Sequence, residues 1–267
     1  MEGALMRKNP VKEKLRSGEA VIGAFCNIPS PAAVEILGLL GFDFAIIDAE
    51  HGIPDLETVE HMVRAAEAVG ITPLVRIALN LQQNILRYLD AGAMGIQIPL
   101  VNSVAEAEAV VRSAKYPPMG RRGLAAVRAG GYGIGRPLGD YVKMANEETL
   151  VIVQVETVDA VRNAADIVKV EGIDAIFIGP TDLSSSMGYP GQPSHPDVVA
   201  TIERVGRMAI AAGKAAGTIA RDPAAYERWR RVGFQYLCTG VTNFLASAAE
   251  GYLKGCRERE GALRAGR

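Results

Sequence analysis

Residues 150–179 read LVIVQVETVDAVRNAADIVKVEGIDAIFIG, and this stretch contains the unit from which the rest of the chain is built. An apolar run, Leu150–Glu156, is followed by an amphipathic segment, Thr157–Val170, and by a second apolar run, Asp174–Gly179. Gly172 lies just before the second run, where a helix commonly stops at a glycine that takes positive φ without a Cβ penalty. The pattern predicts a strand, a helix and a second strand parallel to the first.

The same alternation continues in both directions. The predicted strands are Ala20–Phe25, Phe44–Asp48, Thr72–Arg76, Gly95–Pro99, Leu150–Glu156, Asp174–Gly179, Lys214–Ile219 and Phe234–Thr239. The predicted helices are Pro31–Leu40, Asp55–Val69, Leu81–Ala91, Ser103–Lys115, Thr157–Val170, Pro196–Ala212, Pro223–Val232 and Thr242–Arg257. Eight such units in about 250 residues predict an α/β fold of the (β/α)8 TIM barrel type. An open doubly wound sheet is the alternative, but no G-x-G-x-x-G follows the first strand.

We expect residues 1–267 to form a single domain, with roughly ten peripheral residues at each end. One segment interrupts the alternation. Tyr116–Asp140 is long and rich in glycine and arginine. Long loops in compact domains are usually functional or disordered. We interpret this one as a lid or a subunit contact, with disorder as the alternative.

The composition excludes several classes of protein. Apolar residues make up 49% of the chain, charged residues make up 22%, and the formal net charge is −1. Without a basic excess, nucleic acid is not an expected partner. No apolar run approaches the 18 or so residues that span a bilayer, so we expect no membrane partner. The three cysteines are widely spaced and form no disulfide framework or zinc motif. We therefore expect a cytoplasmic protein without a signal peptide.

Catalytic groups of such barrels lie at the carboxyl ends of the strands. The second strand ends with Asp48, Ala49, Glu50 and His51. Alternate residues of a strand share a face, so Asp48 and Glu50 point the same way. His51 is a candidate general base whose tautomer Asp48 would fix. The alternative is a surface histidine that happens to follow a strand.

The third strand ends with Arg76. A guanidinium at this position is costly unless it meets an anion or a carboxylate. Its fixed charge would suit the oxygen of a developing enolate. The alternative is a structural ion pair with Asp48 or Glu50.

Two carboxylates end the fifth strand and follow the sixth. Gln154 and Glu156 should point into the barrel, and Asp182 follows the sixth strand closely. Carboxylate oxygens suit a hard divalent cation such as Mg²⁺ or Mn²⁺. The alternatives are a helix cap for Glu156 and a turn residue for Asp182. No lysine is placed for a Schiff base, because Lys214 begins a strand and Lys169 lies on a helix. This favours a metal as the electron sink.

An ordered set of motifs in this chain resembles the HpcH/HpaI aldolase family, over a span from about Val21 to Tyr252. The motifs are Ile47-Asp48-Ala49-Glu50-His51, Val75-Arg76, Leu89-Asp90-Ala91-Gly92, Gln97-Ile98-Pro99-Leu100-Val101, Tyr116-Pro117-Pro118-Met119-Gly120 with Arg122-Gly123, Gln154-Val155-Glu156-Thr157, and Ile178-Gly179-Pro180-Thr181-Asp182-Leu183-Ser184. Each motif alone is modest, but the set in this order is highly specific.

The resemblance implies a class II aldolase on a (β/α)8 barrel. It implies that Glu156 and Asp182 hold Mg²⁺, Mn²⁺ or Co²⁺, which pyruvate chelates in that family. It further implies that Arg76 stabilises the enolate oxygen, and that His51, paired with Asp48, takes part in proton transfer directly or through water. Four more residues are implied in the site. Gln154 would lie beside the metal, and Gly179, Pro180 and Thr181 would contact substrate.

The resemblance also implies that Asp90 lies near the site and helps to hold it together. The expected assembly is a homo-oligomer, a hexamer built from dimers that exchange C-terminal helices.

The implied reaction is the reversible cleavage of a 4-hydroxy-2-oxo acid to pyruvate and an aldehyde. The chain departs from the family at Gly240-Val241-Thr242, where members often read G-x-D, and in the loop Leu124–Gly133. These segments shape the aldehyde end, so the sequence does not identify the aldehyde. Two alternatives remain. One is a citryl- or malyl-CoA lyase that uses Arg121, Arg122 and Arg128 as a basic track. The other is a non-catalytic barrel that binds a 2-oxo acid.

Overall fold

The computed structural model describes residues 8–135 and 137–265. Eight parallel strands close into a barrel in chain order, with β1 paired to β8, which confirms the predicted (β/α)8 fold. The strands are β1 Val21–Cys26, β2 Phe44–Ala49, β3 Thr72–Ile77, β4 Gly95–Ile98, β5 Leu150–Gln154, β6 Ala175–Ile178, β7 Ala215–Ile219 and β8 Tyr236–Gly240. Every predicted strand is present, and its bounds differ by no more than two residues from those expected.

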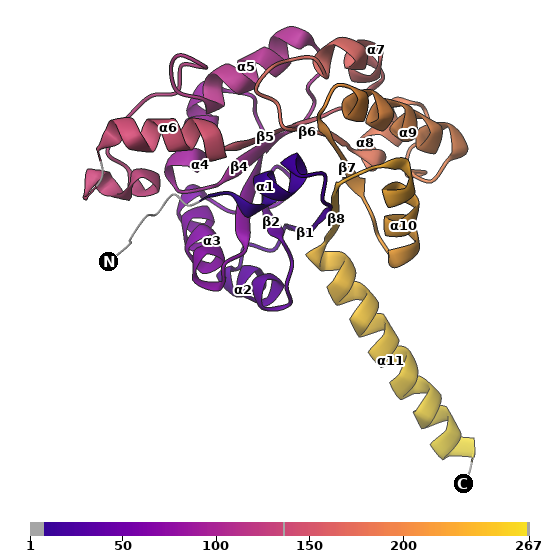
Figure 1. Ribbon diagram of the computed structural model, residues 1–267. Coiled ribbons are helices and arrows are strands. Elements are labelled where there is room, and N and C mark those ends of the chain that lie inside the picture. The colour runs from indigo at the N-terminus through magenta and orange to yellow at the C-terminus, as the bar shows by residue number, and fades with distance from the viewer. Residues whose placement is uncertain (1–7, 136, 266–267) are drawn as a thin grey trace.

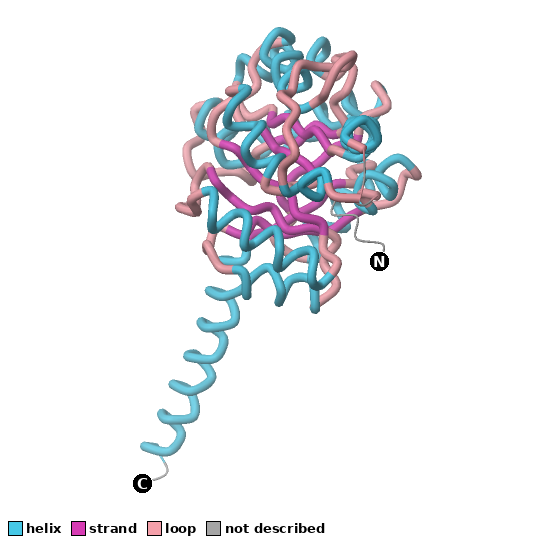
Figure 2. Tube along the Cα trace, turned by 90° about the vertical axis from the view of Figure 1, so that its left-hand side faces the viewer, coloured by secondary structure: helices cyan, strands magenta, loops and turns pink. Residues whose placement is uncertain are grey.

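Helices surround the barrel (Figure 1), and the tube in Figure 2 shows the strands enclosed by them. The helices are α1 Pro10–Arg16, α2 Pro31–Leu39, α3 Leu56–Val69, α4 Gln82–Asp90, α5 Val104–Ala114, α6 Leu138–Glu148, α7 Val158–Ile167, α8 Pro180–Ser186, α9 Pro196–Ala211, α10 Pro223–Val232 and α11 Val241–Ala265, with a 3₁₀ segment, η1, at Arg128–Gly133. The sequence did not predict α1, α6, α8 or η1.

Side chains of each strand divide between two layers. On β5, Val151 and Val153 belong to the layer between strands and helices, whereas Leu150 and Ile152 belong to the barrel interior. This is the division expected from the alternation of side chains along a strand. Gln154 therefore lies on the inner side at the carboxyl mouth, and so does Glu156, just beyond the end of the strand.

The interior is closed below the mouth by aromatic rings. Phe44 and Tyr236 stack with their ring centroids 4.4 Å apart. A Cβ atom at Gly23 would overlap the ring of Phe44, so a glycine makes room for this stack. The packed rings separate the carboxyl mouth from the other end of the barrel.

α1 packs near the amino ends of the strands. The Lys12 ammonium, almost completely buried, donates to the Thr149 carbonyl at 2.8 Å and lies 3.0 Å from the Asp174 carboxylate. Asn9 is fully buried and donates to the Met94 carbonyl at 3.0 Å. Asn9 is therefore part of the buried structure and not peripheral as expected, whereas Pro10 is exposed and residues 1–7 lie outside the described residues.

The long segment after α5 packs along the outer wall of the barrel. Arg122 pairs with Asp90 at 2.7 Å, and Arg128 pairs with Glu67 and donates to the Ala91 carbonyl at 2.9 Å. None of its described residues, 116–135 and 137–140, lines the cavity at the carboxyl mouth described below. The lid interpretation is therefore wrong for this chain, because two buried arginines hold the segment against α3 and α4. A subunit contact stays a prediction.

Only the first turn of the last helix packs on the barrel, where the Phe244 ring lies 5.8 Å from the Phe42 ring between centroids. α11 continues to Ala265, beyond the predicted end at Arg257, and none of its residues is buried. Figures 1 and 2 show it extending away from the body of the molecule. Residues 266–267 at the predicted peripheral end lie outside the described residues. Within the described ranges, no helix combines the length and apolar character needed to cross a membrane.

Candidate active site

A cavity of about 300 Å³ opens at the carboxyl mouth of the barrel. Its wall is formed by residues at or just beyond the ends of seven of the eight strands, all except β4. It includes nearly all of the residues that the sequence analysis assigned to the site, namely Asp48, His51, Arg76, Gln154, Glu156, Gly179, Pro180, Thr181 and Asp182. These residues therefore lie together at the carboxyl ends of the strands, as expected for a barrel enzyme.

Arg76 is held on one side of the cavity by a two-pronged ion pair. The register of β2 and β3 sets Asp48 opposite Arg76, with Nε 2.9 Å from Oδ1 and Nη2 2.7 Å from Oδ2. Nη1 lies 3.2 Å from Oε2 of Glu50, and the guanidinium carbon stands 4.5 Å from the centroid of the Phe25 ring. Two parallel hydrogen bonds fix both the position and the plane of the guanidinium.

Asp48 also organises the turn after β2. Its Oδ1 accepts the backbone N–H groups of Glu50 at 3.1 Å and His51 at 3.2 Å. Burial alone would raise the pKa of Asp48, but the hydrogen bonds and charge of Arg76, together with these two N–H donors, lower it. Asp48 is therefore ionised and fully engaged at neutral pH.

The His51 ring is not the partner of Asp48. Within the described part of the chain, the imidazole forms no hydrogen bond, and Asp48 contacts His51 only through the backbone. The expected Asp48–His51 side-chain pair is therefore not formed, because the strand register places the stronger donor, Arg76, directly beside the carboxylate. The exposed imidazole still lines the cavity.

Glu156 is positioned by a chain of hydrogen bonds that crosses the barrel. The Tyr236 hydroxyl donates to Gln97 Oε1 at 3.1 Å, Gln97 Nε2 donates to Gln154 Oε1 at 2.5 Å, and Gln154 Nε2 donates to Glu156 Oε2 at 2.6 Å. The other oxygen, Oε1, accepts the backbone N–H of Leu100 at 2.8 Å. Each carboxylate oxygen keeps a free lone pair, since an ionised carboxylate offers about four acceptor sites.

The backbone around Glu156 is adapted to it. Leu100 has a φ of 52°, an uncommon conformation for a residue with a side chain, and its N–H is the one that binds Glu156. A Cβ atom at Gly179 would overlap Oε2 of Glu156. Backbone strain of this kind persists where the surrounding structure demands it, and it concentrates at functional sites.

The site holds more negative than positive charge. Burial above all, together with the nearby carboxylates of Asp182 and Glu50, raises the pKa of Glu156 to about 7 against the opposing effect of the Leu100 N–H. Asp48 and Glu50 are paired with Arg76, but neither Glu156 nor Asp182 forms an ion pair with any described residue. A buried carboxylate without a counter-charge is costly when ionised.

A divalent cation fits this arrangement. It would compensate Glu156 and Asp182, and both oxygens of Glu156 retain lone pairs for it. The described residues contain no group of three or more His, Cys, Asp and Glu side chains arranged as a metal cage. Two carboxylates are nevertheless sufficient for Mg²⁺ and related ions, because water and substrate oxygens complete their coordination.

Comparison with known proteins agrees with this geometry. A profile of the HpcH/HpaI aldolase/citrate lyase family matches residues 21–249. The chain belongs to this family. It is 38% identical over 254 residues to a hydroxypyruvate/pyruvate aldolase of Cupriavidus necator, covering 94% of this chain and 93% of that protein. It is also 38% identical to a 4-hydroxy-2-oxo-heptane-1,7-dioate aldolase of Salmonella paratyphi A, covering 91% and 92%.

A solved structure shares the fold over almost the whole chain. The crystal structure of an HpcH/HpaI aldolase/citrate lyase family protein from Burkholderia cenocepacia superposes with a TM-score of 0.89 at 34% identity. The superposition covers 94% of this chain and all of the other. The barrel and its strand order are therefore those of the HpcH/HpaI family.

Asp90 does not line the cavity at the carboxyl mouth of this chain. It is the last residue of α4, five residues before β4 begins, and therefore lies toward the amino ends of the strands. Its carboxylate is 2.7 Å from the buried guanidinium of Arg122. The predicted position beside the site is wrong for the single chain, because helices run back from the carboxyl mouth and carry their last residues away from it.

Glu50, which the sequence offered as an alternative partner of Arg76, forms that ion pair at 3.2 Å. Four polar residues of the cavity wall were not predicted, namely Asn27, Arg221, Thr239 and Asn243. They lie at or just beyond the ends of β1, β7 and β8. Asking which polar residues follow these three strands would have found them, as it found Glu156 and Asp182.

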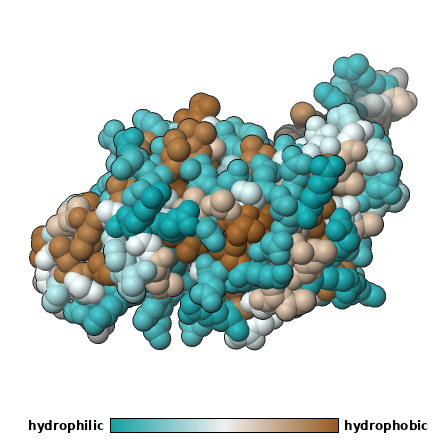
Figure 3. Space-filling model, turned by 90° about the horizontal axis from the view of Figure 1, so that it is seen from above, coloured by the Kyte–Doolittle hydropathy of each residue, from teal (hydrophilic) through white to brown (hydrophobic). Residues whose placement is uncertain are grey.

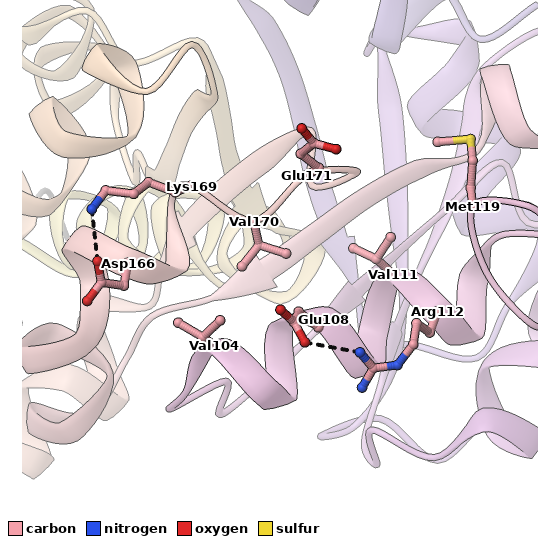
Figure 4. A pocket seen from close by; sticks show the side chains of 9 residues that line it. All are labelled: Val104, Glu108, Val111, Arg112, Met119, Asp166, Lys169, Val170 and Glu171. Carbon is pink, nitrogen blue, oxygen red and sulfur yellow. Dashed lines mark hydrogen bonds and ion pairs between the residues drawn. The ribbon is translucent and has the colours of Figure 1, made fainter.

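A second hollow, between α5 and α7, is a poor candidate for catalysis. Figure 4 shows Val104, Val111 and Val170 beside two local ion pairs, Glu108–Arg112 at 3.1 Å and Asp166–Lys169 at 2.9 Å. The acids and bases there are paired with one another, and no strand end opens into this hollow. On the face of the molecule that Figure 3 shows, apolar patches are interspersed with hydrophilic side chains.

The pairing of Asp48 with Arg76 predicts a large loss of stability when it is broken. Asp48→Asn should lower the free energy of unfolding by about 2 kcal/mol or more, because it leaves a buried guanidinium undercompensated. Urea unfolding of both proteins measures the difference. Asp159→Asn breaks an exposed pair with Arg162 (each side chain 73% exposed) and should change stability by no more than about 0.5 kcal/mol. Equal losses in the two variants would contradict the structural role of Asp48.

Proposed function

We propose that this protein is a divalent-metal-dependent aldolase that reversibly cleaves a 4-hydroxy-2-oxo acid to pyruvate and an aldehyde. The observation that carries the proposal is the pair of carboxylates, Glu156 and Asp182, that line one cavity without an ion pair, in the same wall as the fixed guanidinium of Arg76. The names of the family and of its pyruvate aldolase relatives support the same class of reaction.

Glu156 and Asp182 would hold the metal, which we propose to be Mg²⁺, Mn²⁺ or Co²⁺. Bound there, the ion would supply Lewis acidity and withdraw electron density from the 2-oxo group. Gln154 keeps one Glu156 oxygen in place through its hydrogen bond of 2.6 Å. Gly179, Pro180 and Thr181 form the wall next to Asp182, and we assign them to contact the 2-oxo acid.

Side chains of the protein transfer the proton and stabilise the enolate. His51 accepts the proton of the C4 hydroxyl, and the C4 oxygen becomes the carbonyl of the aldehyde as the C3–C4 bond breaks. The bonding electrons form a pyruvate enolate, whose oxygen is stabilised by the charge of Arg76. Because Asp48 and Glu50 hold Arg76 in place beforehand, little reorganisation is required as the charge develops. A proton added at C3 then completes pyruvate.

The alternatives fit the structure less well. A CoA-thioester lyase with Arg121, Arg122 and Arg128 as its basic track would need these side chains free. Arg122 and Arg128 are instead buried in pairs with Asp90 and Glu67. A barrel that only binds a 2-oxo acid gives no reason for a catalytic base at the rim and a carboxylate whose pKa is raised to about 7.

We also propose that the protein assembles through α11. This helix exposes Phe244, Leu245, Tyr252 and Leu253, and an almost entirely apolar cavity beside β8 and α10 lies open next to it. A second copy that lays its own α11 there would bury both surfaces. Dimers with exchanged helices, combined into a hexamer, are the assembly we propose. A cytoplasmic location is proposed on the three free cysteines.

The aldolase proposal is tested by incubating the protein with pyruvate, Mn²⁺ and a panel of aldehydes, and by following the product by mass. Arg76→Ala should lower kcat by about 100-fold or more, as when a donor to a developing oxyanion is removed. EDTA should abolish activity, and added Mg²⁺ or Mn²⁺ should restore it. Arg64→Ala, which removes an exposed arginine of α3, serves as the control and should keep full activity. Full turnover by Arg76→Ala, or in EDTA, would refute the proposal.

The assembly is tested by light scattering. The wild-type mass should be a multiple of the 28.4 kDa chain mass, and Leu245→Glu with Leu253→Glu should reduce it, because charges would enter the apolar contact. Lys254→Glu, a change of charge on the same helix, should leave the mass unaltered. A wild-type protein of 28.4 kDa in solution would contradict an exchanged dimer.

A further inference from the structure

Beyond the aldolase reaction itself, the cavity indicates which aldehydes the site prefers. We propose that Arg221 binds an anionic group on the aldehyde half of the substrate. The preferred aldehydes would therefore be short molecules that carry a carboxylate or a phosphate. This proposal rests on the proposed function and concerns the part of the cavity formed after β7, β8 and β1.

Arg221 lies where three cavities meet, one of which is the apolar cavity beside β8 and α10. It follows the end of β7 by two residues and lines the same cavity as Arg76 and Glu156. It also lines an adjoining cavity of about 370 Å³, which contains Arg228 and Trp229. A substrate that extends from the metal side of the site across the mouth of the barrel would therefore reach Arg221.

The Arg221 guanidinium has no counter-ion in the part of the chain that the structure describes. Its neighbour Asp222 is engaged elsewhere, because its Oδ1 accepts the backbone N–H of Ala225 at 2.7 Å at the start of α10. Arg228 lies over the Trp229 ring at 4.4 Å. Arg76, in contrast, has two carboxylates within 3.2 Å. Of the two arginines in the active-site wall, Arg221 is the one whose charge is available to a ligand.

Unsatisfied polar atoms lie on the same side of the cavity. Thr239 is 7% exposed, and its Oγ1 is buried without a hydrogen bond. Oδ1 of Asn27 is likewise buried without a partner, and Asn243 lines the wall nearby. Buried polar atoms are nearly always hydrogen-bonded in folded proteins. These atoms therefore indicate a polar ligand at this side, such as the hydroxyl and the charged end of an aldehyde.

The charges of the site are separated in a way that suits such a substrate. Glu156 and Asp182 follow the neighbouring strands β5 and β6, and Arg76 ends β3, so the 2-oxo acid is assigned to that side. Arg221 follows β7, which pairs with β6 and β8 and lies opposite β3, the strand of Arg76, in the closed barrel. A guanidinium binds carboxylate and phosphate through paired charge-assisted hydrogen bonds, which a neutral aldehyde cannot form.

The test compares anionic and neutral aldehydes of matched length. The aldol addition of pyruvate is measured with succinic semialdehyde against butanal, and with glyceraldehyde 3-phosphate against glyceraldehyde. The wild type should show a kcat/KM at least about tenfold higher for the anionic member of at least one pair. The pair that shows the larger preference identifies carboxylate or phosphate as the recognised group.

Arg221→Gln should reduce that preference about tenfold or more, mainly through KM, and leave the neutral aldehydes unchanged. Because Arg221 is exposed, the substitution leaves the core intact. Arg207→Gln, which removes an exposed positive charge from α9, is the matched control and should behave as the wild type.

Three outcomes would overturn the proposal. The first is equal wild-type rates within both pairs. The second is an Arg221→Gln variant whose KM for pyruvate rises equally with every aldehyde, which would assign Arg221 to the pyruvate carboxylate. The third, no product with any aldehyde, would also overturn the aldolase assignment itself.

Discussion

The architecture of the site depends on negative charge that is held inside the carboxyl mouth of the barrel. Four carboxylates interact there, and Arg76 compensates two of them, Asp48 and Glu50. Glu156 is only 1% exposed, and burial raises its pKa to about 7. An uncompensated buried carboxylate lowers stability, and this cost is the physical basis of the proposed cation. In the proposed reaction, Arg76 is the preorganised group for a second negative charge, that of an enolate.

The scaffold maintains this arrangement at several levels. The hydrogen-bond chain from Tyr236 through two glutamines holds Glu156 from within the barrel. The absence of a side chain at Gly179 leaves space for the carboxylate, and the strained Leu100 supplies a donor to it. These are interactions with one oxygen of Glu156 or the other, and none of them neutralises its charge. The fold thus fixes the position of the carboxylate and leaves its charge to a ligand.

Much of the fold and of the candidate site could be predicted from the sequence, and the exceptions have physical causes. The strand bounds could be predicted from the alternation of apolar runs with amphipathic segments. Glu156 and Asp182 could be predicted as site residues because they lie at or just after the ends of strands. α1 and α8 were missed because seven residues are too few for a helical period to emerge, and α6 because it follows a glycine-rich loop. The choice between Arg76 and His51 as the partner of Asp48 depended on strand register, which the sequence left open. Asp90 was misplaced because it ends a helix and not a strand.

The most direct test of the account is calorimetric titration of the protein with Mn²⁺. The wild type should bind one ion per chain at the site of Glu156 and Asp182. Glu156→Gln and Asp182→Asn should each weaken binding by about 10-fold or more, because each removes a charged ligand. Asp159→Asn, an exposed acid of α7, should bind as the wild type does. Undetectable binding by the wild type, or unchanged binding by both ligand variants, would contradict the central claim.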